Sequence, residues 1–197
     1  MTLTFLEYYR SQGLRSRQMR TICLFLFVSI AAGARAQAPD SKEEFINATF
    51  LKVIMDTSEG SYYLIKGSDT CWFEKFDYDE WVKYHLQEQV PLTTLNELAY
   101  KVHIANEPYY WQQDKLKQAK CITAREADSL LFPGVPVPEV MVFSFSQPQF
   151  TDDGQYAVID MNWKTGPVSG TGYTFLLRHK PGGWRIIGSK LNWSHHQ

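Results

Sequence analysis

The stretch Val140–Trp193 contains four consecutive runs rich in Val, Ile, Phe, Tyr and Trp: VMVFSFSQPQF (140–150), QYAVIDMNW (155–163), GTGYTFLLRH (170–179) and GWRIIGSKLNW (183–193). The breaks between the later runs are Asp152-Asp153-Gly154, a glycine-rich connection over 166–172, and Lys180-Pro181-Gly182-Gly183. Each break supplies the Gly or Asp that a tight turn needs. The stretch therefore predicts a four-stranded antiparallel meander at the C-terminal end of the chain.

The residues before this stretch are predicted to be mainly helical. Leu95, Leu98, Ala99 and Val102 fall on one stripe of a helix over 92–104, and Pro91 precedes it. Further helices are predicted after a cap at Ser41 or Asp40, from Trp81 after the acidic residues 77–80, and over 123–131, where Thr123 and Glu126 form a capping box. Residues 61–65 and 116–122 are short strand candidates. These features predict an α+β fold with N-terminal helices packed on the four-stranded antiparallel meander.

The N-terminus has the pattern of a secretory signal peptide. Three arginines precede the apolar run Ile22–Ala32, and Gly33-Ala34-Arg35-Ala36-Gln37 follows it. The alternatives are a membrane anchor or a buried helix, but the run is shorter than the roughly 20 residues that span a bilayer. We predict a signal peptide over 1–36 and one domain over 37–197, secreted or periplasmic, with no transmembrane segment after cleavage.

Charge and motif content exclude several functions. Cleavage would leave 15 basic and 20 acidic residues, and such a balance offers no basic patch for nucleic acid. No His or Cys pair stands at metal-ligand spacing except His195-His196 at the terminus, so no metal is expected. The run Gly166–Gly172 lacks the Lys of a phosphate-binding loop, and no nucleophile elbow occurs. No cofactor is expected.

Two cysteines, Cys71 and Cys121, would remain after cleavage. An even pair in an oxidising compartment is more often a bridge than two thiols, so a Cys71–Cys121 disulfide is the candidate pairing. Its loop of about 50 residues would contribute about 3–4 kcal/mol. The alternative is two buried free thiols.

Alternation along the strands divides the predicted sheet into two faces. Ala157, Ile159, Met161 and Trp163 share the face expected under the helices, whereas Asp160 and Asn162 share the other. A turn at Pro181-Gly182 would pair Leu177 with Ile186 and Phe175 with Gly188, where the glycine leaves room for a ring. Leu176, Ile187, Leu191 and Trp193 make the second face semi-apolar, either covered or a contact surface.

Two groups of residues are candidates for a site. Tyr109, Tyr110 and Trp111 are consecutive aromatics that can stack on a sugar ring or another flat ligand, although aromatics at this density also form cores. His103 with Asp160 is the pair that acid–base chemistry would need, if the fold brings them together.

Two resemblances concern the C-terminal part of the chain. Residues 143–194 have a Ser-x-Pro-x-Phe start, Gly-Gln-Tyr-Ala, a Gly-rich loop and Gly-Trp-Arg-Ile, and they resemble uncharacterised secreted proteins of Bacteroidetes-type bacteria. Those relatives often have cysteines in the Gly-rich loop, which this chain lacks. Helices followed by a meander also resemble, more weakly, the cone-shaped fold of the nuclear transport factor superfamily. This second resemblance implies a curved sheet that can enclose a ligand, but no catalytic residues.

The sequence therefore predicts an exported, non-catalytic domain that binds a small ligand or a partner protein of the cell envelope. The alternative is a small enzyme of the cone-shaped fold that uses a pocket His or Asp. For an envelope partner, the face with Leu191 and Trp193 is the expected contact.

Overall fold

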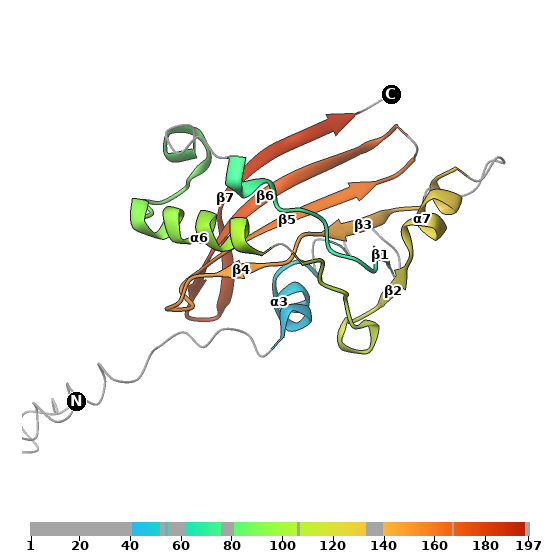
Figure 1. The fold of residues 1–197 in the computed structure, drawn as a ribbon, viewed down its shortest axis with the longest axis horizontal. Helices are drawn as coiled ribbons and strands as arrows, with labels where there is room; N and C mark the ends of the chain where they lie inside the picture. Colours follow the sequence, from blue (N-terminus) through green and yellow to red (C-terminus); the bar gives the residue numbers. More distant parts are fainter. Residues whose placement is uncertain are drawn as a thin grey trace, which may run out of the picture. The chain divides into compact units, whose positions relative to one another are not determined.

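The structure is a computed structural model that describes residues 41–51, 54, 62–75, 81–105, 107–132, 140–166 and 168–195. These residues build one sheet with helices on both of its faces (Figure 1). The helical elements are α3 (Lys42–Thr49), η1 (Trp72–Lys75), η2 (Trp81–His85), α6 (Leu92–Ile104), η3 (Gln113–Lys115) and α7 (Ala124–Leu131). The strands are β1 (Tyr62–Ile65), β2 (Ala119–Ile122), β3 (Val142–Phe145), β4 (Gln149–Phe150), β5 (Tyr156–Lys164), β6 (Gly170–Lys180) and β7 (Gly183–His195).

The predicted signal peptide, residues 1–36, lies outside the described residues, and so do the acidic residues 77–80. In the part of the chain that the structure describes, no helix is long and apolar enough to span a bilayer.

The sheet has seven strands in the order β2-β1-β3-β5-β6-β7, with β4 paired to β5. Strand β1 runs parallel to both β2 and β3, whereas the pairs from β3 to β7 are antiparallel. The prediction of N-terminal helices on a four-stranded antiparallel meander is therefore wrong, although the fold combines helices with a sheet. Parallel neighbours are joined by long crossovers rather than turns, so no local signal showed that β1 and β2 extend the sheet.

The first predicted strand is divided in two. Strand β3 pairs with β5 at residues 161–164, and β4 pairs with β5 at residues 157–158. Pro148 stands just before β4 and has no N–H to give to the ladder, which accounts for the interruption.

The β6–β7 hairpin follows the predicted register only near its turn. Lys180 pairs with Gly183 and Leu177 with Ile186, so Pro181-Gly182 is the two-residue turn. An irregularity between Leu176 and Leu177 then shifts the register, and Gly188 pairs with Leu176 instead of Phe175. A Cβ on Gly188 would lie 2.9 Å from both Trp81 and Leu86, so the ring that uses this space comes from η2.

Local sequence signals account for the helices. The Ser41 hydroxyl accepts the Glu44 N–H at 3.1 Å and begins α3. The Thr123–Glu126 capping box begins α7, as predicted. The buried residues of α6 are Leu95, Leu98 and Val102, which belong to the predicted stripe.

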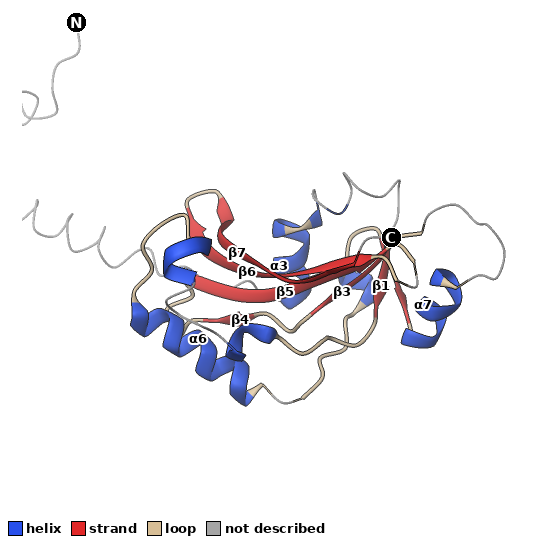
Figure 2. Cartoon of the chain, turned by 90° about the horizontal axis from the view of Figure 1, so that it is seen from above, coloured by secondary structure: helices blue, strands red, loops and turns tan. Residues whose placement is uncertain are grey.

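Both faces of the sheet are covered, as Figure 2 shows with α3 on one side and α6 and α7 on the other. Phe45 and Ile46 of α3, with Phe50 just after it, pack on the predicted core face of β5, where Ile159 and Met161 are buried. Leu95, Leu98 and Val102 of α6 form a second core with the other face, where the buried strand residues are Tyr156, Val158, Leu176 and Ile187. A third cluster joins α7 to β2 and β3.

Candidate functional site

Trp193 of β7 lies over β6 at a place where β6 has glycines instead of side chains. Gly172 pairs with Trp193 on one side and with Asn162 on the other. A Cβ on Gly172 would overlap Trp193 Nε1 and Asn162 Oδ1, and a Cβ on Gly170 would lie 3.0 Å from Trp193 Cη2. Glycine in a strand interior commonly marks such a close approach, so Gly170 and Gly172 make room for the indole.

A chain of hydrogen bonds fixes this indole. Trp193 Nε1 donates to Asn162 Oδ1 at 3.0 Å, and Asn162 Nδ2 donates to Asp69 Oδ2 at 3.1 Å. Ser144 of β3 donates its hydroxyl to the same Asp69 oxygen. Asn162 and Ser144 are both buried. Three strands and the loop after β1 thus hold Trp193 in one orientation.

A second carboxylate, Asp160 of β5, holds the loop that carries Trp72. Asp160 is fully buried, and its Oδ2 accepts the backbone N–H of Trp72 at 2.8 Å. Its Oδ1 accepts the Thr174 hydroxyl at 2.6 Å and the Cys71 thiol at 3.5 Å. Asn192 Nδ2 lies 3.5 Å from Oδ2 and donates to the Thr174 hydroxyl at 3.0 Å. Asp160 therefore ties the start of η1 to β6 and β7.

Burial dominates the electrostatics of this network. It raises the pKa of the Asp160 carboxyl to about 6, because the hydrogen bonds from Thr174, Trp72 and Cys71 offset the loss of solvent only in part. The charge of Asp69 raises this pKa further. Burial, followed by the charge of Asp160, also raises the pKa of the Cys71 thiol well above its usual range, so this thiol is a poor nucleophile.

A hollow of about 420 Å³ lies in front of the network. Its lining residues are Trp72, Lys164, Val168, Ser169, Asn192, Trp193 and His195. Trp72 is 48% exposed, and the His195 ring lies 6.3 Å from the Trp193 ring. The hollow thus combines indole and aliphatic walls, an amide and an ammonium group, a combination suited to a small organic ligand.

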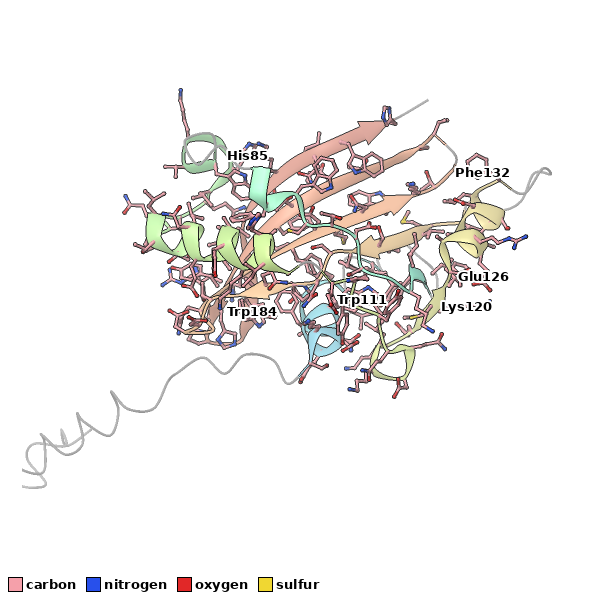
Figure 3. All side chains as sticks on the ribbon, viewed as in Figure 1. His85, Trp111, Lys120, Glu126, Phe132 and Trp184 are labelled. Carbon is pink, nitrogen blue, oxygen red and sulfur yellow. The ribbon has the colours of Figure 1, made fainter. Side chains whose placement is uncertain are left out.

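The structure places the three aromatic residues predicted to contact a ligand, 109–111, in different environments. Tyr110 is 61% exposed, Tyr109 is half-buried, and Trp111 is 2% exposed beside α3 (Figure 3). Tyr110 and Trp111 line another hollow, of about 410 Å³, that is distinct in its residues from the first.

The predicted Cys71–Cys121 disulfide is not present, because both cysteines are free. Cys71 belongs to the core beneath α6, whereas Cys121 of β2 packs against the core beneath α3. The two thiols therefore lie on opposite faces of the sheet.

The structure does not bring His103 and Asp160 together. His103 is exposed on α6, and the donors to the Asp160 carboxylate are a backbone N–H, a hydroxyl, a thiol and an amide. Asp160 therefore positions its neighbours in this structure.

Leu191 and Trp193 were predicted to share a contact face, and this is wrong. A register shift between Gly172 and Tyr173 pairs Trp193 with Gly172 but Leu191 with Tyr173, so the two side chains point to opposite faces. Sequence reasoning also missed Trp72, Asp69 and Asn192. The available signal was the polar set Asp160, Asn162 and Thr174 inside apolar strands, together with the two glycines of β6.

A scan against protein-family models, a search of curated proteins and a search of solved structures each found no match to this chain. The resemblances noted for residues 143–194 therefore stay predictions, and the functional argument depends on the geometry of the site.

Proposed function

We propose that the protein binds a small molecule in the hollow lined by Trp72 and Trp193. The molecule would present a flat apolar ring to the indoles and an acidic group to Lys164. The observation that carries this proposal is the chain of hydrogen bonds from Trp193 through Asn162 to Asp69, which holds a half-buried indole in place. An indole that is already fixed loses little conformational freedom when a ligand stacks on it.

The charge of the hollow supports an anionic ligand. Among the described residues that line the hollow, Lys164 and His195 are the basic ones, and none of these lining residues has a carboxylate side chain. Asp69 and Asp160 lie behind the hollow and already accept hydrogen bonds from protein groups. The Asn192 amide adds a hydrogen-bonding group that can orient the acidic group of the ligand.

Binding of the fluorescent probe 1-anilinonaphthalene-8-sulfonate, a naphthalene ring with a sulfonate, tests the proposal. Trp193→Ala should weaken binding by about tenfold, the effect of losing 1.4 kcal/mol. Leu191→Ala is the matched control, because Leu191 is 49% exposed on the same strand but on the opposite face. Lys164→Gln should weaken binding and reduce its dependence on salt. Equal affinities of the Trp193 and Leu191 variants would contradict the proposal.

Export is part of the same proposal. The basic flank, the apolar run Ile22–Ala32 and the small residues before Gln37 support it. Expression of the full sequence in a bacterium, followed by intact mass measurement of the periplasmic fraction, should give a chain that starts at Gln37. A periplasmic protein that still carries residues 1–36 would contradict the predicted cleavage.

A further inference from the structure

We infer that the hollow lined by Tyr110 and Trp111 is a second binding site, independent of the first, and that it takes a saccharide. The hollow measures about 410 Å³, and Lys66, Gln112, Gln113, Asp114 and Cys121 complete its lining. It is formed by the segment that leads into η3 together with β2 and the residue after β1.

The first argument is an indole without a hydrogen-bond partner. Trp111 is 2% exposed, and its Nε1–H has no acceptor among the described residues. An unpaired buried donor costs about 1–3 kcal/mol, and buried polar groups in folded proteins are nearly always paired. Trp111 is one of the residues that line the hollow, so this unpaired donor belongs to a residue in the wall of the candidate site.

The second argument is an acceptor without a donor directly behind the same segment. Glu43 of α3 is fully buried, and its Oε1 accepts the Tyr109 hydroxyl at 2.7 Å and the Gln112 N–H at 3.1 Å. Its Oε2 has no partner among the described residues. The segment 109–112 thus carries an unpaired indole N–H and contacts a carboxylate that has one unpaired oxygen. Hydroxyl groups both accept and donate hydrogen bonds, so a ligand that carries several of them matches both kinds of unpaired atom.

The rim of the hollow selects among ligands with hydroxyl groups. Tyr110 is 61% exposed and offers a ring face, while the side chains of Gln112, Gln113 and Asp114 are exposed polar groups. A sugar ring presents C–H groups that stack on an aromatic face and hydroxyls that bond to amides and carboxylates. Lys66 and Asp114 have opposite charges, so the rim favours a neutral ligand over an ionic one.

The backbone of this segment is fixed before any ligand binds. The Trp111 N–H donates to the Lys66 carbonyl at 3.0 Å, and the Cys121 N–H donates to Gln113 Oε1 at 3.0 Å. The Tyr109 ring meets the Trp111 ring edge-on, with centroids 5.1 Å apart. A pre-organised site of this kind binds with a smaller entropy loss.

The test is an NMR titration of the ¹⁵N-labelled full chain with methyl glycosides of glucose, galactose and mannose. Trp111→Phe, which loses one indole signal, assigns Trp111, and Trp193→Phe assigns Trp193. We expect at least one glycoside to shift the Trp111 indole signal and to leave the Trp193 signal in place. Tyr110→Ala should weaken this binding about tenfold. Tyr100→Ala is the matched control, since Tyr100 is 64% exposed on α6 and does not line the hollow.

Three outcomes would overturn the inference. One is that no glycoside shifts the Trp111 signal at high millimolar concentration, and another is an equal affinity of the Tyr110 and Tyr100 variants. A shift of the Trp193 signal alone would place the saccharide in the first hollow and would equally overturn it. Because the sulfonate probe reports on Trp193, failure here is distinguishable from failure of the proposed function.

Discussion

Asp160 and Asp69 have the same task at the scale of single residues, since each connects a tryptophan of the first hollow to the sheet. Asp160 acts directly on the Trp72 backbone, and Asp69 acts on the Trp193 side chain through Asn162. Both carboxylates accept several donors, which is how a buried polar network becomes rigid. A buried charge nevertheless loses its hydration, and this loss appears in the pKa of Asp160.

The raised pKa of Asp160 predicts how stability depends on pH. Its pKa is about 6 in the folded protein and 3.8 ordinarily, so the folded state holds a proton that the unfolded state has released between these values. The contribution of Asp160 to the free energy of unfolding is therefore fully present below 3.8 and is lost as the pH rises through about 6. The difference is about 3 kcal/mol at most.

Urea unfolding of the wild type and Asp160→Asn at several pH values measures this effect. Subtracting the two curves removes the titration of groups that both proteins share. The free energy of the wild type, relative to the variant, should increase as the pH falls from neutral to about 4. A pH-independent difference would show that Asp160 does not titrate in this range.

Gly172 provides a second test at the residue scale. A methyl group at this position would overlap Trp193 Nε1 and Asn162 Oδ1, whereas at Gly166 it would meet nothing within 4 Å. We expect Gly172→Ala to reduce the free energy of unfolding by about 1–3 kcal/mol and to displace the Trp193 indole. Gly166→Ala should leave both unchanged. Urea unfolding and the indole NMR signal are the measurements, and equal behaviour of the two variants would refute the role given to Gly172.

At the scale of elements, the sequence predicted whatever depends on local chemistry. The stripe of α6, the capping box of α7 and the turn at Pro181-Gly182 all appear as expected. The register of the β6–β7 pair beyond Leu177 was not predicted. We attribute its two irregularities to packing against η2 and to the hydrogen bonds of Asn192, neither of which is local in the sequence. The first shift moves the following side chains to the other face and the second moves them back, so Leu191 was assigned to the wrong face whereas Trp193 lies on the predicted one.

The capping box of α7 gives the prediction at this scale. The Thr123 hydroxyl accepts the Glu126 N–H at 3.2 Å, while the Glu126 side chain accepts the Thr123 N–H at 2.7 Å. Thr123→Ala should lower the free energy of unfolding by about 1 kcal/mol. Ser129→Ala, an exposed change on the same helix, should have a smaller effect. Chemical denaturation compares them, and a larger loss for Ser129→Ala would contradict the capping role.

At the scale of the whole domain, the first hollow is assembled from segments far apart in the sequence. Trp72 follows β1, Lys164 ends β5, and Trp193 lies near the end of β7. The sequence did not predict that these residues lie around one hollow, because their arrangement depends on where the parallel strand β1 enters the sheet beside β3. For the second hollow, the sequence had singled out two of the lining residues, Tyr110 and Trp111, because they are adjacent in the chain.

The opposite placement of the two cysteines predicts their reactivity in the native protein. Cys71 is buried with a strongly raised pKa, whereas Cys121 is half-buried and lines the second hollow. In a chain with Cys23→Ser, a thiol reagent should modify Cys121 faster than Cys71, which should react only after unfolding, although burial raises the pKa of both thiols. Mass spectrometry of the labelled peptides identifies each site. Rapid labelling of Cys71, or a disulfide between the two, would contradict the structure.

The central claim is that the hollow lined by Trp72 and Trp193 binds a flat, anionic ligand. A crystal structure of the protein with 1-anilinonaphthalene-8-sulfonate tests it most directly. We predict the naphthalene ring against the Trp193 indole and the sulfonate toward Lys164, with the bond from Trp193 to Asn162 intact. A probe bound elsewhere, or the hollow filled by the Trp72 side chain, would contradict the account.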